Sequence, residues 1–191
     1  MTTIAVLGLM GVGKSTVGGL VAVRLHCSIV DSDDWIEGHY GMTGRAVAEK
    51  QGVDALHDIE AEMLGDVLDA GGQVVVTPAA SVIDRPELRE RIRTETTAFH
   101  LDLPYDQLEV RMATGPHRRT VDSDEMHQLY RRRRPLFDGV SLATLDASEP
   151  PALLAELIVG LTRAGASSSG VDFGRQGPDI SILGLETRRP R

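Results

Sequence analysis

Eight residues near the start of the sequence, Gly8–Ser15, have the types and spacing of a phosphate-binding loop. A glycine, four residues and then Gly-Lys-Ser form the P-loop pattern, in which the glycines let the backbone wrap closely around an anion. An apolar run typical of a buried strand, Ile4–Leu7, precedes the loop, and Ser15–Leu25 carries apolar residues at helical spacing after it. Strand, loop and helix together direct backbone N–H groups at a phosphate. The sequence therefore predicts a site for a nucleoside triphosphate.

The residues of this loop have separate expected roles. The Lys14 ammonium would place a positive charge beside the β- and γ-phosphates, and the Ser15 hydroxyl would bind Mg²⁺. Lysine is scarce in this chain, which has only Lys14 and Lys50. The predicted nucleotide-binding residues of the loop are Gly11, Val12, Gly13, Lys14, Ser15 and Thr16.

Two carboxylates, Asp31 and Asp33, follow a second apolar run that ends at Val30. In open parallel sheets ligands bind beyond the carboxyl ends of the strands, and in a continuing strand both side chains would point to the same side. One carboxylate near Mg²⁺ and another near an acceptor hydroxyl would suit a small-molecule kinase. The alternative is a helix start at which Ser32, Asp33 or Asp34 caps the following helix. The spacing alone leaves both open.

Other classes of P-loop protein fit the sequence less well. GTPases normally recognise guanine through Asn-Lys-x-Asp, and this chain contains no asparagine. Motor ATPases usually need a longer chain and a strand that ends in a metal-binding acid, which Val74–Thr77 lacks. Asp102 could take that place, but it could equally cap the helix that follows it.

The composition fits one soluble domain. The chain has 191 residues and a net charge of −8, which argues against general binding to nucleic acid or to a membrane surface. A single cysteine, Cys27, fits a reducing compartment, and no apolar run is long enough to cross a membrane. With no signal peptide evident at the N-terminus, we expect a cytoplasmic monomer that acts on a small molecule.

Short strand patterns alternate with helical patterns along the chain. This order favours an α/β fold with a parallel sheet and helices on both faces. The predicted strands are residues 3–8, 28–31, 73–77, 97–102 and 141–145. The predicted helices are residues 14–26, 33–39, 44–51, 53–70, 85–94, 104–113, 124–134 and 149–163.

Three local patterns mark boundaries. Asp84 comes shortly before Pro86 and could cap the helix that Pro86 begins. Residues 114–123 are polar, contain glycine and proline and lack periodicity, so we expect a mobile loop there. Residues 164–191 carry scattered serine, glycine, proline and arginine, so we expect a tail that is disordered or loosely docked on a domain of residues 1–163.

From residue 3 to about residue 160 the sequence resembles the shikimate kinase family. The matching pieces stand in the family's order and spacing, which is more specific than any one of them. They are the P-loop through Gly18, the Asp-x-Asp site Asp31-Ser32-Asp33, Gly41-Met42-Thr43 at the start of an acceptor-binding region, Arg119 in the lid, and Arg133-Arg134-Pro135-Leu136-Phe137.

The resemblance implies a fold and an activity. The fold would be a three-layer P-loop kinase fold, like that of nucleoside-monophosphate kinases, with five parallel strands, an acceptor region and a mobile lid at about residues 114–123. The activity would be ATP-dependent phosphoryl transfer, with Mg²⁺, to a hydroxyl of a small hydroxylated carboxylate. Shikimate is the first acceptor to consider. Closing the lid would exclude water and so prevent ATP hydrolysis.

The resemblance also implies roles for single residues. Asp33 would position and deprotonate the acceptor hydroxyl, while Asp31 would hold Mg²⁺ through water together with Ser15. Arg119 would close onto the γ-phosphate, so that Lys14, Asp33 and Arg119 form the catalytic set. Arg133 would bind the acceptor carboxylate.

The acceptor side departs from the family pattern at two places. The family has an arginine in a Phe-Arg-x-x-Glu element, and this chain has His57 there, which cannot form a bidentate fork on a carboxylate. The family's Gly-Gly-Gly after the third strand is replaced by Pro78, Ala79 and Ala80. Proline has no N–H, and the two alanine methyls would narrow the pocket. The predicted acceptor-binding residues are Asp33, His57, Ala79, Ala80 and Arg133.

These departures leave two alternatives open. One is a paralogous kinase of another small acceptor, such as a cyclitol, a sugar acid or a modified shikimate. The other is a nucleotide-binding regulator that has lost catalysis. The run Arg131–Arg134 is not expected to bind nucleic acid, because four successive helical residues point all around the helix. One arginine in the site and three in solvent is the expectation.

Overall fold

The computed structural model describes residues 3–114 and 123–168. Arg119 and the rest of residues 115–122 lie outside the described residues, as do residues 169–191. The predicted lid and most of the predicted tail are therefore not part of the structure considered below.

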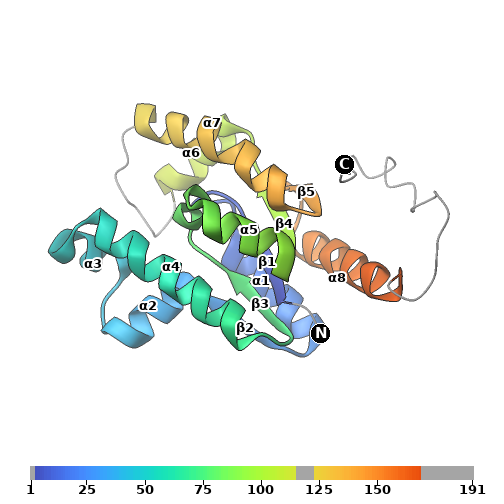
Figure 1. Cartoon of the computed structure of the whole chain (residues 1–191). Coiled ribbons are helices and arrows are strands. Elements are labelled where there is room, and N and C mark those ends of the chain that lie inside the picture. Colours follow the sequence, from blue (N-terminus) through green and yellow to red (C-terminus); the bar gives the residue numbers. More distant parts are fainter. Residues whose placement is uncertain (1–2, 115–122, 169–191) are drawn as a thin grey trace.

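Five parallel strands form one sheet (Figure 1). They are β1 (Thr3–Leu7), β2 (Ser28–Asp31), β3 (Val74–Thr77), β4 (Thr96–Asp102) and β5 (Ala143–Asp146). The order across the sheet is β2-β3-β1-β4-β5, so the strand that leads into the P-loop lies in the middle. Because every strand is parallel, the carboxyl ends of all five meet at one edge.

Helices connect the strands and cover both faces of the sheet (Figure 1). Helices α1 and α8 pack against each other, and α5 lies against β4 with α4 and α7 beside it. The helices are α1 (Lys14–Leu25), α2 (Ser32–Tyr40), α3 (Gly44–Gln51), α4 (Val53–Ala70), α5 (Pro86–Glu95), α6 (Tyr105–Thr114), α7 (Ser123–Val140) and α8 (Pro151–Ser168). The α/β class, the parallel sheet and its five strands are as predicted from the sequence.

Three parts of the secondary structure differ from the prediction. A short 3₁₀ helix, η1 (Ala80–Asp84), was not predicted. Helix α7 continues through Pro135 to Val140, although a proline inside a helix removes a hydrogen bond. Phe137 is completely buried in the core, and its packing holds the last turn in place. Helix α8 continues to Ser168, five residues beyond the predicted end.

Buried apolar residues form two separate clusters. The main core lies on both sides of the sheet and includes the C-terminal part of α4. The small core contains Ile36, Val47, Leu56 and Ile59, with Trp35, Met42 and Ala48 packed against it. Its members come from α2, α3 and the first turns of α4. These three helices therefore pack around a small core of their own beside the sheet (Figure 1).

Two glycines allow close approaches that a side chain would block. Gly8 has a φ of 142°, and a Cβ at this residue would lie 2.6 Å from the carbonyl oxygen of Leu101 in β4. Gly18 in α1 faces β3, where a Cβ would overlap Cγ2 of Thr77. The P-loop and its helix therefore lie directly against the two strands on either side of β1.

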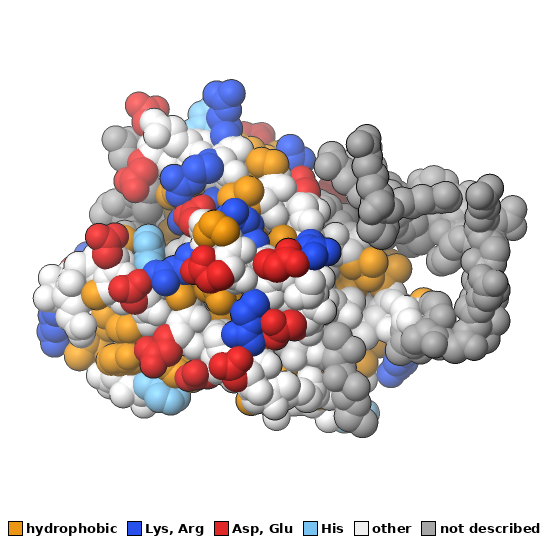
Figure 2. Space-filling view, viewed as in Figure 1, with side chains coloured by type: hydrophobic (Ala, Val, Ile, Leu, Met, Phe, Trp, Pro, Cys, Tyr) orange, Lys and Arg blue, Asp and Glu red, His pale blue; other side chains and the backbone are white. Residues whose placement is uncertain are grey.

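Charged side chains of both signs are interspersed over the face that carries α4 and α5 (Figure 2). Many of them pair with each other, such as Arg91 with Asp69 at 2.7 Å and with Glu95 at 2.8 Å. Among the described helices, none combines the length and the hydropathy needed to cross a membrane.

Candidate functional site

The P-loop connects the end of β1 to the start of α1. Gly13 precedes the helix in a left-handed conformation, with φ of 101°, so the helix N-terminus opens onto the loop. Lys14 is the first helical residue, and its Nζ donates a hydrogen bond to the carbonyl oxygen of Leu9 at 3.1 Å. The loop therefore folds around the ammonium group, while the side chains of Ser15 and Thr16 are exposed beside it.

The electrostatic surroundings of Lys14 are those of a polar site. Burial lowers the pKa of the Lys14 ammonium below its ordinary value of 10.5, and the nearby carboxylates of Asp33, Asp31 and Glu60 oppose that change. Arg133 is also close enough to contribute, and it lowers the pKa further. The two predicted carboxylates and the predicted acceptor arginine thus surround the same ammonium group.

Asp31 is the last residue of β2 and caps α2. Its Oδ1 accepts hydrogen bonds from the backbone N–H groups of Asp33 at 3.0 Å and Asp34 at 3.5 Å. Its Oδ2 accepts a hydrogen bond of 2.5 Å from the hydroxyl of Thr77, at the end of the neighbouring strand β3. The prediction of a helix start was therefore right, but the capping residue is Asp31 instead of Ser32, Asp33 or Asp34.

This geometry also corrects the expectation that Asp31 and Asp33 share one side of a continuing strand. The strand ends at Asp31, and Asp33 lies in the first turn of α2 with an exposed side chain. The change of backbone direction separates the two carboxylates, one held beside β3 and the other presented to solvent near Lys14.

An arginine that the sequence reasoning did not single out lies next to the P-loop. Arg111, in α6, donates hydrogen bonds to the carbonyl oxygens of Val12 at 3.4 Å and Ala147 at 2.9 Å. It therefore joins the loop to the segment after β5. No local pattern marks Arg111, because both of its partners are far away in the sequence.

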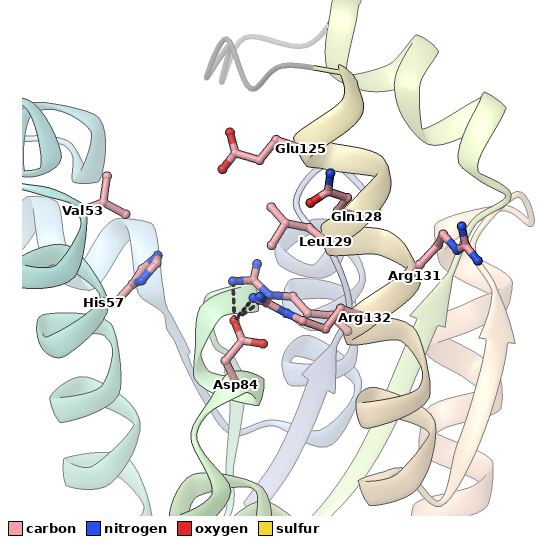
Figure 3. A pocket seen from close by; sticks show the side chains of 9 residues that line it. Val53, His57, Asp84, Glu125, Gln128, Leu129, Arg131 and Arg132 are labelled. Carbon is pink, nitrogen blue, oxygen red and sulfur yellow. Dashed lines mark hydrogen bonds and ion pairs between the residues drawn. The ribbon is translucent and has the colours of Figure 1, made fainter.

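A pocket of about 760 Å³, the candidate acceptor pocket, lies between α4 and α7, with η1 at its base (Figure 3). His57 and Val53 line one wall, and α7 supplies the opposite wall. The residues that line it are Val53, His57, Asp84, Glu125, Gln128, Leu129, Arg131, Arg132 and Arg133. His57 and Arg133, two of the predicted acceptor-binding residues, thus line one pocket, whereas Asp33, Ala79 and Ala80 are not among its lining residues.

Arg133 is only 8% exposed and is held by Asp84. Its Nε and Nη2 both donate to Oδ2 of Asp84, at 3.0 and 2.7 Å, and Nη2 of Arg132 donates to the same oxygen at 2.8 Å. The prediction that Asp84 caps α5 is wrong, because the residue at the cap is Arg85 and no side chain bonds to the helix start. The two arginines of α7 draw the carboxylate towards the pocket instead.

Glu60 is a second buried group that sequence reasoning did not count among the site residues. It lies one turn after His57 on α4, is 9% exposed, and accepts a hydrogen bond from the hydroxyl of Ser81 in η1. The family's Phe-Arg-x-x-Glu element corresponds to Leu56–Glu60 in this chain, and the glutamate that ends it could have indicated Glu60. The contact fixes η1 against α4, and with it the floor of the pocket.

The segment that replaces three glycines has an ordinary backbone. Pro78 is buried, and Ala79 precedes η1 with φ of −59° and ψ of 150°. Ala79 and Ala80 are half-buried, and neither is among the residues that line the pocket. None of the three needs a positive φ, so the chain turns here by forming η1, and glycine is not required.

Comparison with known proteins decides the family. The sequence profile described as shikimate kinase matches residues 10–162 of this chain. The chain belongs to the shikimate kinase family. A shikimate kinase of Cupriavidus pinatubonensis is 32% identical over 158 residues, which cover 80% of this chain and 82% of that one. A shikimate kinase of Bradyrhizobium diazoefficiens is 31% identical, with coverage of 85% and 80%.

Solved structures agree with this assignment. A shikimate kinase from Acinetobacter baumannii, in complex with shikimate, superposes with a TM-score of 0.78 at 25% identity and covers 86% of this chain and 94% of its own. A gluconokinase from Sinorhizobium meliloti shares the fold alone, with a TM-score of 0.60 at 18% identity. Members of the shikimate kinase family are small-molecule kinases, and this chain is one of them.

Shikimate kinases use ATP as phosphoryl donor together with Mg²⁺, and the residues present here fit both. Lys14 and the N-terminus of α1 are positioned for phosphates. The hydroxyl of Ser15 and the carboxylate of Asp31 are oxygen donors, which Mg²⁺ prefers. Within the described residues no group of three or more metal-binding side chains occurs.

Proposed function

We propose that this protein transfers the γ-phosphoryl group of ATP to a hydroxyl of shikimate or of a closely related hydroxylated carboxylate. The observation that carries the proposal is that Asp31 and Asp33 lie close enough to Lys14 to raise its pKa, at the carboxyl-end side of the sheet. Arg133, which also affects Lys14, lines a pocket there. The shikimate complex of the Acinetobacter baumannii relative supports the choice of acceptor.

Each residue has a role in the proposed reaction. Lys14 and the N–H groups of Gly11–Thr16 bind the phosphates. Ser15 and Asp31 would hold Mg²⁺, which when bound would neutralise phosphate charge. Asp33 accepts the proton of the acceptor hydroxyl, and its exposed position lets an acceptor reach it. Arg119, which is not among the described residues, is proposed to stabilise the γ-phosphate.

The proposed acceptor residues come from several elements. Arg133 would approach the acceptor from α7 and His57 from α4, on opposite sides of the pocket. Ala79 and Ala80 would contact it from the segment that leads into η1. The protein is proposed to act as a cytoplasmic monomer without nucleic acid.

The test is an assay of ADP release with MgATP and shikimate. We expect ADP release that depends on shikimate, and a loss of at least about 100-fold on Lys14→Met, since removing one group that stabilises transition-state charge costs that much. Lys50→Met is the matched control, because Lys50 is an exposed residue of α3 and the only other lysine of the chain.

Thermal unfolding separates binding from catalysis. MgATP at 100 times its Kd should stabilise the wild type by about 2.7 kcal/mol. Stabilisation by MgATP without ADP release for any hydroxylated acceptor would contradict the proposed kinase and support the regulator alternative.

A further inference from the structure

The hydrogen-bonding edge of Arg133 is already occupied by a carboxylate of this chain. Nε and Nη2 form the edge with which an arginine binds a carboxylate bidentately, and both donate to Asp84 at 3.0 and 2.7 Å. Arg133 is buried, so its guanidinium cannot swing freely away to a new partner. An acceptor carboxylate must therefore compete with Asp84 for this edge.

Asp84 stays negatively charged beside Arg133 and so competes with an acceptor carboxylate. Burial alone would raise the pKa of its carboxyl, but hydrogen bonds and charge from Arg133 and Arg132 outweigh that cost and lower the pKa. Asp84 is thus ionised at neutral pH. Asp84 reduces the net charge of this group from the +2 of the two arginines to +1, so it weakens the attraction of an anionic acceptor without abolishing it.

The rest of the pocket does not replace the occupied edge. His57 stands where the family has a second arginine, and an imidazole cannot form two parallel hydrogen bonds to a carboxylate. Pro78 lacks an N–H where the family has glycine. Three features of this chain thus weaken carboxylate binding on the acceptor side: one on α4, one in the segment before η1 and one between η1 and α7.

We propose that Asp84 is an internal competitor for the carboxylate of the acceptor, and that it widens the acceptor range of this kinase to uncharged ring polyols. The inference rests on the proposed function, since it concerns the acceptor of the same reaction. For an uncharged acceptor the contact between Asp84 and Arg133 stays intact, and no desolvated charge has to be exchanged. The pocket wall then serves as a hydrogen-bonding surface for hydroxyl groups, because all three donated bonds go to Oδ2 of Asp84 and leave Oδ1 to accept.

The experiment compares two acceptors that differ at a single group, which is charged in one and neutral in the other. They are shikimate and the same molecule with its carboxylate reduced to a hydroxymethyl group. A pair of hydrogen bonds between charged groups is worth at least about tenfold in binding. Because Asp84 competes for this pair, we expect the wild type to prefer shikimate over the reduced analogue by less than about 30-fold in kcat/KM. A larger wild-type preference would overturn the proposal without any variant.

Asp84→Asn removes the competing charge and retains the shape. We expect the KM for shikimate to fall about tenfold, with kcat within about twofold, and no improvement for the reduced analogue. A merely structural role would change both acceptors alike. Asp69→Asn is the matched control, because Asp69 pairs with Arg91 far from the pocket and is 72% exposed. Asp84→Ser repeats the test if the asparagine variant does not fold.

Two kinds of failure are distinguishable. Wild-type protein that is stabilised by MgATP but phosphorylates neither acceptor overturns the proposed function, and the inference with it. Turnover of shikimate with a KM that Asp84→Asn leaves unchanged or raises overturns the inference alone.

Discussion

Neighbouring donors decide what each carboxylate of this molecule can do. Asp31 receives hydrogen bonds from Thr77 and from the start of α2, so both of its oxygens are fixed in direction. Asp33, two residues later, has an exposed side chain whose charge raises the pKa of the Lys14 ammonium. A fixed carboxylate suits an ion and its water shell, whereas an accessible one suits a hydroxyl that arrives with the acceptor. We therefore assign proton transfer to Asp33.

Asp33→Asn should lower kcat by about 100-fold or more, because a positioned base contributes 10²–10⁴-fold. The measurement is steady-state ADP release with the acceptor that turns over. Asp34→Asn is the matched control, since Asp34 is exposed on the same turn of α2. Equal losses in the two variants would contradict the role of Asp33 and indicate a general effect of charge.

A third carboxylate, Asp138, serves stability at a distance from the site. It accepts hydrogen bonds from buried His100 at 2.8 Å and from Thr144 at 2.7 Å. The hydrogen bond from His100 outweighs the cost of burial and, with Thr144, lowers the pKa of Asp138 to about 2. Because the folded pKa lies below the unfolded one, this contact stabilises the fold fully above about pH 4 and loses its effect as the pH falls towards 2.

Asp138→Asn should accordingly reduce the free energy of unfolding by about 1–2 kcal/mol at pH 7. Calorimetry from pH 7 down to pH 2.5 should show a constant difference from the wild type above about pH 4 and a shrinking one below it. The comparison variant Asp58→Asn removes a carboxylate that is 72% exposed, and should cost less than about 0.5 kcal/mol. A difference that grows on acidification would refute this account.

At the scale of elements, the close packing of α1 on β3 links the phosphate loop to Asp31, the carboxylate proposed to hold Mg²⁺. Gly18 leaves room for Thr77, and Thr77 directs its hydroxyl at Asp31. A side chain on α1 at this point must push β3 away or turn Thr77 aside. The glycine after the P-loop is therefore required by the neighbouring strand.

Gly18→Ala should destabilise the fold by about 1–2 kcal/mol, since overpacking costs 1–3 kcal/mol and alanine returns up to about 1 in a helix. Gly19→Ala is the control, because a Cβ there meets no heavy atom within 4 Å, and it should stabilise by up to about 1 kcal/mol. Urea denaturation of both variants measures the difference. If Gly18→Ala leaves both the free energy of unfolding and MgATP binding unchanged, β3 can shift to make room for the methyl group and the prediction is wrong.

Local sequence patterns were sufficient to predict the helices and strands, but not the hydrogen-bond partners of side chains that lie far apart in the sequence. The P-loop, the strand ends at Asp31 and Thr77 and the helix end at Gly71 follow from short-range chemistry, and the structure has them where predicted. Asp84 was assigned to the nearest helix start because the sequence shows only near neighbours. Its real partner, Arg133, is 49 residues away. Arg111 was missed for the same reason, since Val12 is 99 residues distant.

At the scale of the whole molecule, donor and acceptor sides are built from different parts of the chain. The P-loop depends on β1, α1 and β4, which form the centre of the sheet. The acceptor pocket depends on α4, η1 and α7, at one side of it. Substitutions at His57 or Asp84 can therefore change the acceptor while the ATP site keeps its geometry.

The small core has a consequence for motion. Its four buried residues hold α2 and α3 against the start of α4, whereas the rest of α4 belongs to the main core. Helices with so few buried contacts open by local fluctuation at a lower free energy than the central strands. Amide hydrogen exchange should therefore be faster in α2 and α3 than in β1 and β4, and slower again once an acceptor is bound. Entry of the acceptor would then need only a partial opening, with the nucleotide held throughout on a sheet that does not open.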